Sequence, residues 1–358
     1  MTQAAPAYDR VGIVRAFDVQ ARACDALGSP LTAFLLRGVI ADYQAGGASR
    51  DLLAPLESRQ QWEAVTSLRL AGALHFLVLA GRTPGLAAYY PSAGGTFRED
   101  GFRAEMERAM RGEAGFIEAF IRRAPQTNEV RRTGALVGGF LIIAARTGLP
   151  LRCLEVGASA GLNLHWDRFR YDFAGAAWGD RASPVTIGTA WTGDAPETGV
   201  SARVIERAGC DINPIDLSSA EAVLRLKSYV WPDHPGRFRI LERATDLARR
   251  HPVALETADA ADWTARHLAE PRPGVATVVF HSIAAQYFSD GTRAAFEAAI
   301  RDAGHRASGA APVAWLRMEQ ASPVQLPEIR LTIWPGGHDL LLGHAHPHGL
   351  FAHWMPRS

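Results

Sequence analysis

Residues 154–164 read LEVGASAGLNL, and this stretch decides the fold. An apolar run leads into it from Leu151, and a helical pattern follows it. Strand, tight turn and helix in this order are typical of an open α/β sheet, in which ligands bind at the carboxyl ends of the strands. Gly157 permits close approach of a ligand to the backbone, and Gly161 lets the helix begin near the strand. We expect N–H groups at the start of that helix to point outward, where the helix dipole favours negative charge.

Strands and helices alternate through the rest of the chain. We expect strands at residues 151–156, 203–210, 253–257, 275–280 and 313–318, and helices at residues 162–170, 220–230, 237–250 and 292–303. Two further apolar runs, residues 329–334 and 339–342, bracket a Pro-Gly-Gly-His sequence, which is the pattern of a closing β-hairpin. The alternation predicts a mostly parallel sheet that helices cover on both faces, with this C-terminal β-hairpin at its edge.

The first 150 residues follow a different pattern. Apolar residues recur at three- and four-residue spacing in segments 11–26, 31–45, 58–80, 101–123 and 127–147, which Gly and Pro clusters separate. We therefore predict an α/β protein with an all-helical N-terminal region at residues 1–125, which caps the substrate side, and a Rossmann-like domain at residues 126–358. A Gly-, Trp- and Thr-rich stretch at about 171–200 is expected to be an insertion, either a hairpin or an excursion loop.

Composition and charge argue against several classes of protein. Hydrophobic residues make up 47% of the chain and charged residues 21%, so a sizeable core can be buried. The formal net charge is +1, with both signs interspersed, which disfavours a nucleic-acid partner. The 3 cysteines are far apart and form no CxxC, which disfavours a disulfide framework or a structural zinc site. With no secretory signal and no apolar run long enough for a bilayer, we expect a cytoplasmic protein without a membrane partner that acts on a small molecule.

The glycine-rich turn resembles the first motif of class I S-adenosylmethionine-dependent methyltransferases, an acid followed by Gly-x-Gly-x-Gly after the first strand. Ser159 stands in place of the middle glycine. The resemblance implies a Rossmann-like methyltransferase-type fold and S-adenosylmethionine as the cofactor. Glu155, Gly157, Ser159 and Gly161 would surround its methionine part, and we count two neighbours with them as cofactor-binding residues, Ala158 and Asn163. The spacing differs from the Gly-x-Gly-x-x-Gly of dinucleotide-binding proteins, so NAD is less favoured.

The same resemblance implies acids at the ends of the next two strands. Asp211 is the candidate for the acid that holds the ribose hydroxyls, with Asp172 as its rival at more ordinary spacing. Asp259 matches the position that contacts the adenine amino group. On the substrate side we place His281 and Tyr287 as catalytic residues, since a histidine at a strand end can act as a general base near neutral pH. The alternative for His281 is a cap on the following helix.

Over most of its length the sequence resembles a bacterial family described as domain of unknown function 2332. Six segments carry this resemblance: residues 126–130, 157–164, 209–214, 229–233, 280–282 and 346–349. The family carries no established reaction, so the resemblance supports the fold more than the chemistry.

Other interpretations of these residues stay open. Gly157–Gly161 is also a Gly-x-Ser-x-Gly pattern, so Ser159 could be the nucleophile of an α/β-hydrolase; partners would come from Asp262 or Asp290 and from His338 or His344. The domain could also bind a cofactor without catalysis. A third interpretation is a metal site formed by His344, His346 and His348, with His338 as a further candidate ligand, but we expect no metal because Pro347 and Gly349 break strand geometry. The favoured function is an S-adenosylmethionine-dependent methyltransferase.

Overall fold

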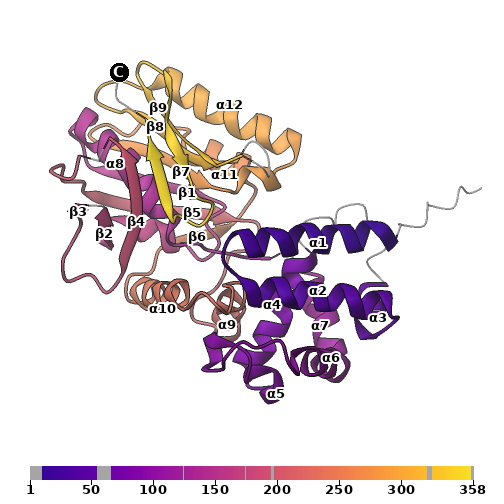
Figure 1. Cartoon of the computed structure of the whole chain (residues 1–358). Coiled ribbons are helices and arrows are strands. Elements are labelled where there is room, and N and C mark those ends of the chain that lie inside the picture. The colour runs from indigo at the N-terminus through magenta and orange to yellow at the C-terminus, as the bar shows by residue number, and fades with distance from the viewer. Residues whose placement is uncertain are drawn as a thin grey trace, which may run out of the picture. The chain divides into compact units, whose positions relative to one another are not determined.

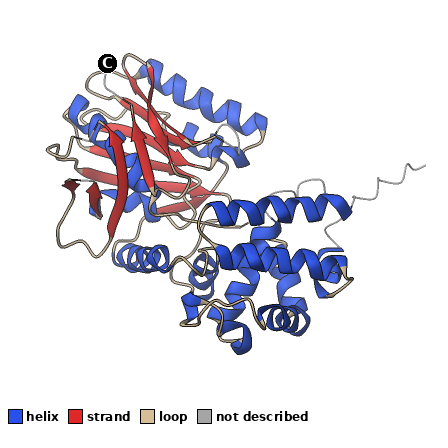
Figure 2. Cartoon of the chain, viewed as in Figure 1, coloured by secondary structure: helices blue, strands red, loops and turns tan. Residues whose placement is uncertain are grey.

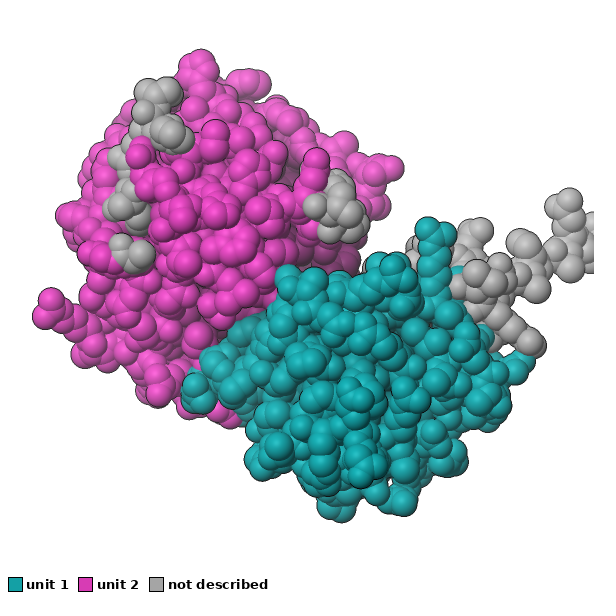
Figure 3. Space-filling model, viewed as in Figure 1, with its two compact units in different colours: residues 1–127, 219–239 teal, residues 128–218, 240–358 magenta. Residues whose placement is uncertain are grey.

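The chain forms two compact units in the computed structural model, which describes residues 10–54, 66–123, 125–173, 175–194, 197–320 and 325–355. Unit 1 consists of residues 1–127 and 219–239, and unit 2 of residues 128–218 and 240–358 (Figure 3). The predicted division after residue 125 lies close to the first of these boundaries. The predicted domains differ from the observed units at residues 219–239. These residues belong to the helical unit 1, although they follow the first strands of unit 2 in the chain.

All the regular structure described in unit 1 is helical (Figure 2). Its elements are α1 (Arg10–Ala26), α2 (Pro30–Gln44), α3 (Ala48–Leu53), α4 (Thr66–Leu79), α5 (Pro84–Ala87), η2 (Pro91–Ala93), α6 (Phe102–Gly112), α7 (Ala114–Ile121), α9 (Ala220–Ser228) and the first turn of α10 (Pro235–Arg250). The helix predicted at 101–123 is two helices, because Glu113 has the non-helical angles φ −120 and ψ 21. The helix predicted from residue 58 is described from Thr66, since residues 55–65 lie outside the described part.

Contacts across a long sequence separation hold residues 219–239 in unit 1. A side chain at Gly72 of α4 would meet the ring of Tyr229, whose Cε1 lies 2.9 Å from the position of the missing Cβ. The Asp233 carboxylate accepts hydrogen bonds from the Leu31 amide (3.0 Å) and the Ser29 hydroxyl (2.5 Å) at the start of α2. A carboxylate there favours the helix dipole and satisfies a backbone N–H that has no partner within the helix.

Unit 2 is built on one 11-stranded sheet (Figures 1 and 2). Its strands are β1 (Leu151–Val156), β2 (Arg170–Phe173), β3 (Ala176–Trp178), β4 (Thr186–Gly193), β5 (Val204–Asp211), β6 (Ala254–Thr257), β7 (Ala276–Ser282), β8 (Val313–Glu319), β9 (Glu328–Trp334), β10 (Asp339–Ala345) and β11 (Phe351–Trp354). Their order is β3-β2-β4-β11-β10-β9-β8-β7-β1-β5-β6. The α/β class, the mostly parallel sheet and the hairpin of β9 and β10 agree with the prediction.

Helices cover both faces of the parallel part of the sheet. On one face, the Phe140 ring of α8 (Arg132–Thr147) packs on Phe280 of β7 at 5.1 Å and stacks on Trp166 at 4.1 Å. On the other face, Phe296 of α12 (Asp290–Arg306) packs on Trp315 of β8 at 6.1 Å, beside α11 (Ala260–His267). β1 is buried along its whole length, as a parallel strand between two helical layers should be.

The predicted insertion at about 171–200 extends the sheet. β2, β3 and β4 lie within it, and β4 pairs in parallel with β11, a strand that the sequence patterns did not predict. Trp191 of β4 packs on Trp354 of β11 with ring centroids 4.6 Å apart. Within the described residues, none of the helices is both long and apolar enough to cross a bilayer.

Candidate functional site

The turn after β1 lies where the strand order of the sheet reverses. The five parallel strands at one side run in the order β6-β5-β1-β7-β8, which in chain order is third, second, first, fourth, fifth. Doubly wound sheets with this order bind ligands outside the carboxyl ends of the first and fourth strands, at the reversal point. Those two strands are β1 and β7, so Gly157 and the residues after Ser282 occupy this point.

Backbone strain is concentrated at the same place. Gly157 (φ 68) and Gly161 (φ 69) use the left-handed region, which glycine adopts without penalty. Ser159 (φ 52) and Ile283 (φ 51) are the described non-glycine residues with positive φ. For a β-branched residue such as isoleucine this conformation is unfavourable, and such strain costs on the order of 1–3 kcal/mol. It persists only where the surrounding contacts impose it, which is frequent at binding sites.

The amides of the turn are used inside the protein. Ser159 N donates to the Asp211 carboxylate (2.9 Å), and Leu162 N donates to Asn128 Oδ1 (3.0 Å). Ala158 N donates to the Cys210 carbonyl at 2.9 Å. The following element, η3 (Leu162–Arg168), is a short 3-10 helix rather than the expected α-helix. The N–H groups that we expected to point outward therefore donate hydrogen bonds within the protein at these positions. Side chains are the groups of the turn that remain to contact a ligand.

Three buried polar side chains of this turn have atoms with no hydrogen-bond partner in the described part of the chain. They are Glu155 Oε2, Ser159 Oγ and Asn163 Oδ1. Glu155 is only 2% exposed, and its other oxygen accepts a hydrogen bond from Asn163 Nδ2 at 3.3 Å. An unpaired buried polar atom costs about 1–3 kcal/mol, so three in one turn mark a place where a ligand would supply partners.

Burial makes Glu155 hard to ionise. Loss of solvation raises its pKa well above the usual value, and the negative charge of Asp211 adds to this. The Asn163 hydrogen bond and the charge of Arg132 act in the opposite direction without reversing it. Arg132 itself donates to the carbonyls of Ser282 (3.1 Å) and Pro347 (2.9 Å), so it ties α8 to the end of β7. A positively charged ligand group beside Glu155 would favour its ionised form.

His281 lies on the opposite face of the sheet from Glu155. Glu155 is in register with Phe280, so these two share a face, and the next residue points to the other side. There the His281 ring accepts a hydrogen bond from Trp315 Nε1 at its Nε2 (3.0 Å) and hydrogen bonds Glu319 through Nδ1 (2.6 Å). We expected His281 to be a base that faces the turn. In the structure its ring is 1% exposed, and both ring nitrogens form hydrogen bonds. In this structure His281 therefore contacts Trp315 and Glu319 on the face of the sheet opposite to Glu155.

Glu319 at the end of β8 holds the segment that follows β7. Its Oε1 accepts hydrogen bonds from the amides of Ala284 (3.0 Å) and Ala285 (3.4 Å) as well as from His281. Burial alone would raise the Glu319 pKa, but the His281 contact and the two amides outweigh it and lower the pKa. Ala284 in turn lies against Gly157, where an added Cβ would come within 2.7 Å of the Ala284 Cβ. Sequence reasoning missed Glu319; an acid at a strand end was its only signal.

The remaining predicted site residues take varied positions. Tyr287 is 66% exposed in η4 (Ala285–Tyr287). Asp259 follows β6, caps α11 by accepting from Ala261 N (2.8 Å), and accepts from Thr292 Oγ1 (3.1 Å). Asp211 is the last residue of β5, the second parallel strand. Its rival Asp172 lies on β2, at the far side of the sheet, where it hydrogen bonds Arg170. The structure thus brings Glu155, Asp211 and Asp259 to one edge and leaves Asp172 away from it.

The two histidines that the hydrolase interpretation names lie away from Ser159. Ser159 Oγ has no hydrogen-bond partner among the described residues. His338 lies in the turn between β9 and β10, beside the amino end of β8, because Trp334 is in register with Val313. His344 of β10 is at the carboxyl side but four strands from β1, about 19 Å at ordinary strand spacing. The two candidate acids begin helices on the opposite face: Asp262 in α11 and Asp290 in α12.

The C-terminal histidines do not gather around one point. His344 pairs with His353 of β11 and Glu328 of β9, while His346 Nδ1 accepts the His348 amide at 3.0 Å. Within the ranges that the structure describes, no cluster of three or more His, Cys, Asp or Glu side chains is placed to hold a metal ion.

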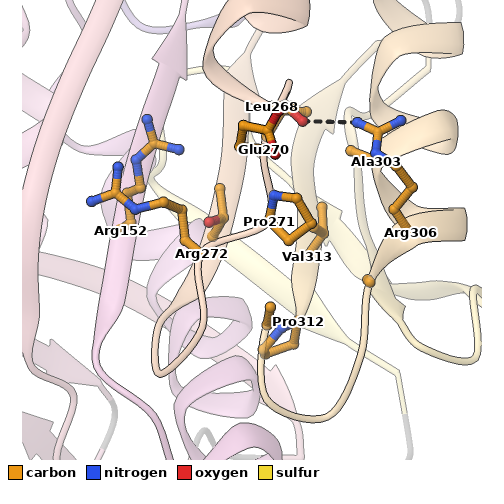
Figure 4. Close-up of a pocket in the computed structure, with 12 residues that line it drawn as sticks. Arg152, Leu268, Glu270, Pro271, Arg272, Ala303, Arg306, Pro312 and Val313 are labelled. Carbon is orange, nitrogen blue, oxygen red and sulfur yellow. Dashed lines mark hydrogen bonds between the residues drawn. The ribbon is translucent and has the colours of Figure 1, made fainter.

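A small hollow opens at the other edge of the sheet, at the amino ends of β1, β7 and β8 (Figure 4). Arg152, Arg272 and Arg306 line it, and each is already engaged: Arg306 donates to the Leu268 carbonyl at 2.9 Å, and the other two share Glu206. Its cavity volume of about 10 Å³ has room for roughly one water molecule. It is too small for a substrate and lies at the edge where doubly wound sheets do not bind ligands.

Comparison with known proteins gives one match. No curated protein and no solved structure matches the chain. A family model described as "Uncharacterized protein conserved in bacteria (DUF2332)" matches residues 14–354, which covers both units. The chain therefore belongs to the DUF2332 family of bacterial proteins.

Proposed function

We propose that unit 2 binds S-adenosylmethionine and that the protein transfers its methyl group to a small molecule. One observation carries this proposal: at and beside the turn after β1, at the reversal point of the parallel sheet, three buried polar side chains have atoms without a hydrogen-bond partner in the described part of the chain. Strain at Ser159 and Ile283 marks the same point. A ligand with both charged and neutral polar groups would satisfy these atoms.

Glu155 and Asn163 fit the amino-acid part of this cofactor. Glu155 Oε2 is buried without a partner, and an ammonium group would supply both a hydrogen bond and a compensating charge. Asn163 Oδ1 is a second unpartnered acceptor in the same turn. Glu155 would release its proton when such a group binds, because burial keeps it protonated otherwise.

The acids at the neighbouring strand ends fit the nucleoside part. Asp211 accepts one amide at each oxygen, from Ser159 and from Asn213, and an ionised carboxylate has about four acceptor positions. We assign the ribose hydroxyls to Asp211 and the amino group to Asp259, because both acids lie at the carboxyl ends of the strands that follow β1 in the order of the sheet. Ile212 is 74% exposed after β5, and Tyr287 is exposed after β7, so apolar surface stands on both sides of the β1 turn.

Methyl transfer needs little from the protein besides alignment. The cofactor supplies an activated methyl group on a sulfonium sulfur. The chain's part is to orient the reactants in line and to place charge, which can supply much of the rate enhancement. Of the two residues first assigned to catalysis, Tyr287 has the exposed position at this edge, whereas His281 acts by holding Glu319 and the 283–287 segment.

Calorimetry and thermal melting with S-adenosylhomocysteine test the proposal. Because a ligand that binds only the folded state stabilises it, we expect the melting temperature to rise with ligand concentration. NAD⁺ is the matched control ligand and should give no shift, since the turn lacks the dinucleotide spacing. No shift with millimolar S-adenosylhomocysteine on folded protein would contradict the proposal.

A further inference from the structure

Unit 1 contains a hydrogen-bonded serine–histidine pair that the proposed cofactor site does not use. Ser92 Oγ lies 2.7 Å from His75 Nε2. The other ring nitrogen, His75 Nδ1, lies 3.0 Å from the Ser228 carbonyl oxygen. The histidine comes from α4, the serine from η2 and the carbonyl from the end of α9, so three separate segments of unit 1 build this arrangement.

The carbonyl of Ser228 fixes the tautomer of the imidazole. A carbonyl can only accept, so Nδ1 carries the hydrogen and Nε2 of the neutral ring has its lone pair toward Ser92. The Ser92 hydroxyl therefore donates to Nε2. A nucleophile within 2.6–3.2 Å of a base, with a third group orienting that base, is the geometry of an activated hydroxyl; here a backbone carbonyl stands where hydrolase triads place a carboxylate.

A hydrogen-bond donor without a partner lies beside the pair. The Tyr90 side chain is fully buried, its ring lies 5.5 Å from that of His75, and its hydroxyl has no partner in the described part of the chain. Burial raises the Tyr90 pKa far above its ordinary range, so the hydroxyl keeps its proton and can donate. A buried hydroxyl donor near a nucleophile can stabilise the oxyanion that forms in acyl transfer.

Ser92 is the partly exposed member of the pair, and aromatic rings surround the buried His75 and Tyr90. Ser92 is half-buried and is followed by exposed Ala93 and Gly94. The half-buried ring of Phe238 lies 6.2 Å from that of His75, and Phe102 packs against Tyr90 at 6.3 Å. Apolar surroundings of this kind favour an apolar acyl group over a charged one.

We propose that Ser92 is a nucleophile, with His75 as its base and Tyr90 as oxyanion donor, in a second site that cleaves carboxylic esters with an apolar acyl group. In the first step the Ser92 oxygen bonds to the ester carbonyl carbon, and its proton moves to His75 Nε2. The alcohol then leaves with that proton. In the second step water attacks the acyl-serine and gives a proton to Nε2, which returns it to Ser92 as the acid departs. Ester and water thus yield acid and alcohol.

A fluorophosphonate probe on the full-length protein tests this site. We expect the probe to modify Ser92, as located by peptide mass spectrometry, and Ser92→Ala to abolish both labelling and hydrolysis of p-nitrophenyl butyrate. Ser67→Ala is the control, because it removes a buried serine hydroxyl of unit 1 that has no partner in the described part of the chain, and it should leave labelling unchanged. Folded wild-type protein that stays unlabelled, or that is labelled at another serine such as Ser159, overturns the proposal.

Substitution of the base separates catalysis from structure. His75→Gln retains hydrogen-bonding capacity but cannot take a proton, so labelling should slow by about 10²–10⁴-fold while thermal melting shows a folded protein. Burial lowers the His75 pKa to about 4, so the free base predominates across the neutral range. We therefore expect equal labelling rates at pH 5.5 and pH 7.5. An unchanged rate in His75→Gln contradicts His75 as the base.

Discussion

The two edges of the parallel strands in unit 2 differ in how their polar groups are satisfied. At the amino edge, Arg152 is buried but donates to Glu206 (2.6 Å) and the His267 carbonyl (2.9 Å). At the carboxyl edge, Glu155 and Ser159 hold buried atoms that have no partner among the residues that the structure describes. The backbone repeats this difference, because the described positive-φ residues other than glycine, Ser159 and Ile283, both lie at the carboxyl edge.

This difference indicates which edge is shaped by stability and which by function. The buried charge at the amino edge is paired, and the hollow there has room for roughly one water molecule, which leaves no space for a ligand. Unpaired buried groups and strain lower stability, and folded proteins keep them where a ligand or a reaction requires them. Changes at the two edges should therefore affect different measurements.

The largest effect is expected at Gly157. Gly157→Val should abolish binding of S-adenosylhomocysteine, a loss of more than about a hundredfold, because a side chain there meets Ala284 and strains a backbone with φ 68. Calorimetry measures the binding, and far-UV circular dichroism checks the fold. Ala284→Gly added to Gly157→Ala should restore the stability lost to the clash but not that lost to the backbone angle. Unchanged affinity in Gly157→Val would place the ligand elsewhere.

At the amino edge we expect substitutions to change the stability of the fold and to leave ligand affinity unchanged. Arg152→Ala should lower the free energy of unfolding by about 2–3 kcal/mol, since it leaves Glu206 and the His267 carbonyl without a buried partner. Arg272→Ala is the control; its ion pair with Glu206 is half exposed and should contribute at most about 1 kcal/mol. Denaturant unfolding gives both values. A loss of ligand affinity in Arg152→Ala would contradict the division between the edges.

Asp211 tests the acids of the carboxyl edge. Asp211→Asn should weaken binding of S-adenosylhomocysteine roughly ten- to a hundredfold, because a hydrogen bond to a charged group contributes about 1.5–3 kcal/mol. Asp172→Asn is the matched control on the far strand β2 and should bind normally. If Asp172→Asn weakens binding and Asp211→Asn does not, the assignment of the second-strand acid is wrong.

Substitution of Glu155 should raise the stability of the protein and weaken its binding of the ligand. The folded state raises its pKa, so it favours the protonated form, and its stability decreases as pH rises from the unfolded pKa toward the folded one. Glu155→Gln removes this dependence. The variant should melt higher than the wild type at pH 8, with a smaller difference at pH 5, and should bind S-adenosylmethionine more weakly. In the wild type, affinity for the ligand's ammonium group should increase with pH. Equal melting temperatures at pH 8 would mean that Glu155 is not held protonated.

Ser159 should have the smallest effect. Ser159→Ala removes one of the three side-chain atoms that the ligand would satisfy and leaves the other two, so affinity should fall by less than about tenfold; the ligand-free protein should not lose stability, because the hydroxyl has no partner among the described residues. Calorimetry and unfolding measure both. Loss of an esterase activity in this variant would instead support the α/β-hydrolase interpretation.

Local patterns predicted the parallel half of the sheet well. The strand before Gly157, the strand that ends at Ser282 and the final hairpin all follow from apolar runs bounded by turn residues. The acids at the ends of β5 and β6 were found for the same reason, because the carboxyl ends of parallel strands meet at one edge. The sequence predicted those features that depend on residues only a few positions apart in the chain.

Features that depend on distant partners could not be predicted. β11 is four residues long and forms only because β10 and β4 flank it. The face on which His281 lies is set by register with β1 and β8, and its engagement depends on Glu319, 38 residues away. The contact of His75 with Ser228 spans 153 residues. Residue type and spacing carry no signal for such pairs.

The return of residues 219–239 to unit 1 has a consequence for the order in which the chain folds during synthesis. Chains emerge from the ribosome from the N-terminus, and domains usually fold as units in that order. Here Asp233, which satisfies the amide of Leu31, is made 202 residues after Leu31, and Ser228 is made 153 residues after His75. Unit 1 therefore stays incomplete until all of β1 to β5 has been made. Until then, the surface around Gly72 of the nascent helices stays uncovered. We expect chaperones to bind the chain during this interval.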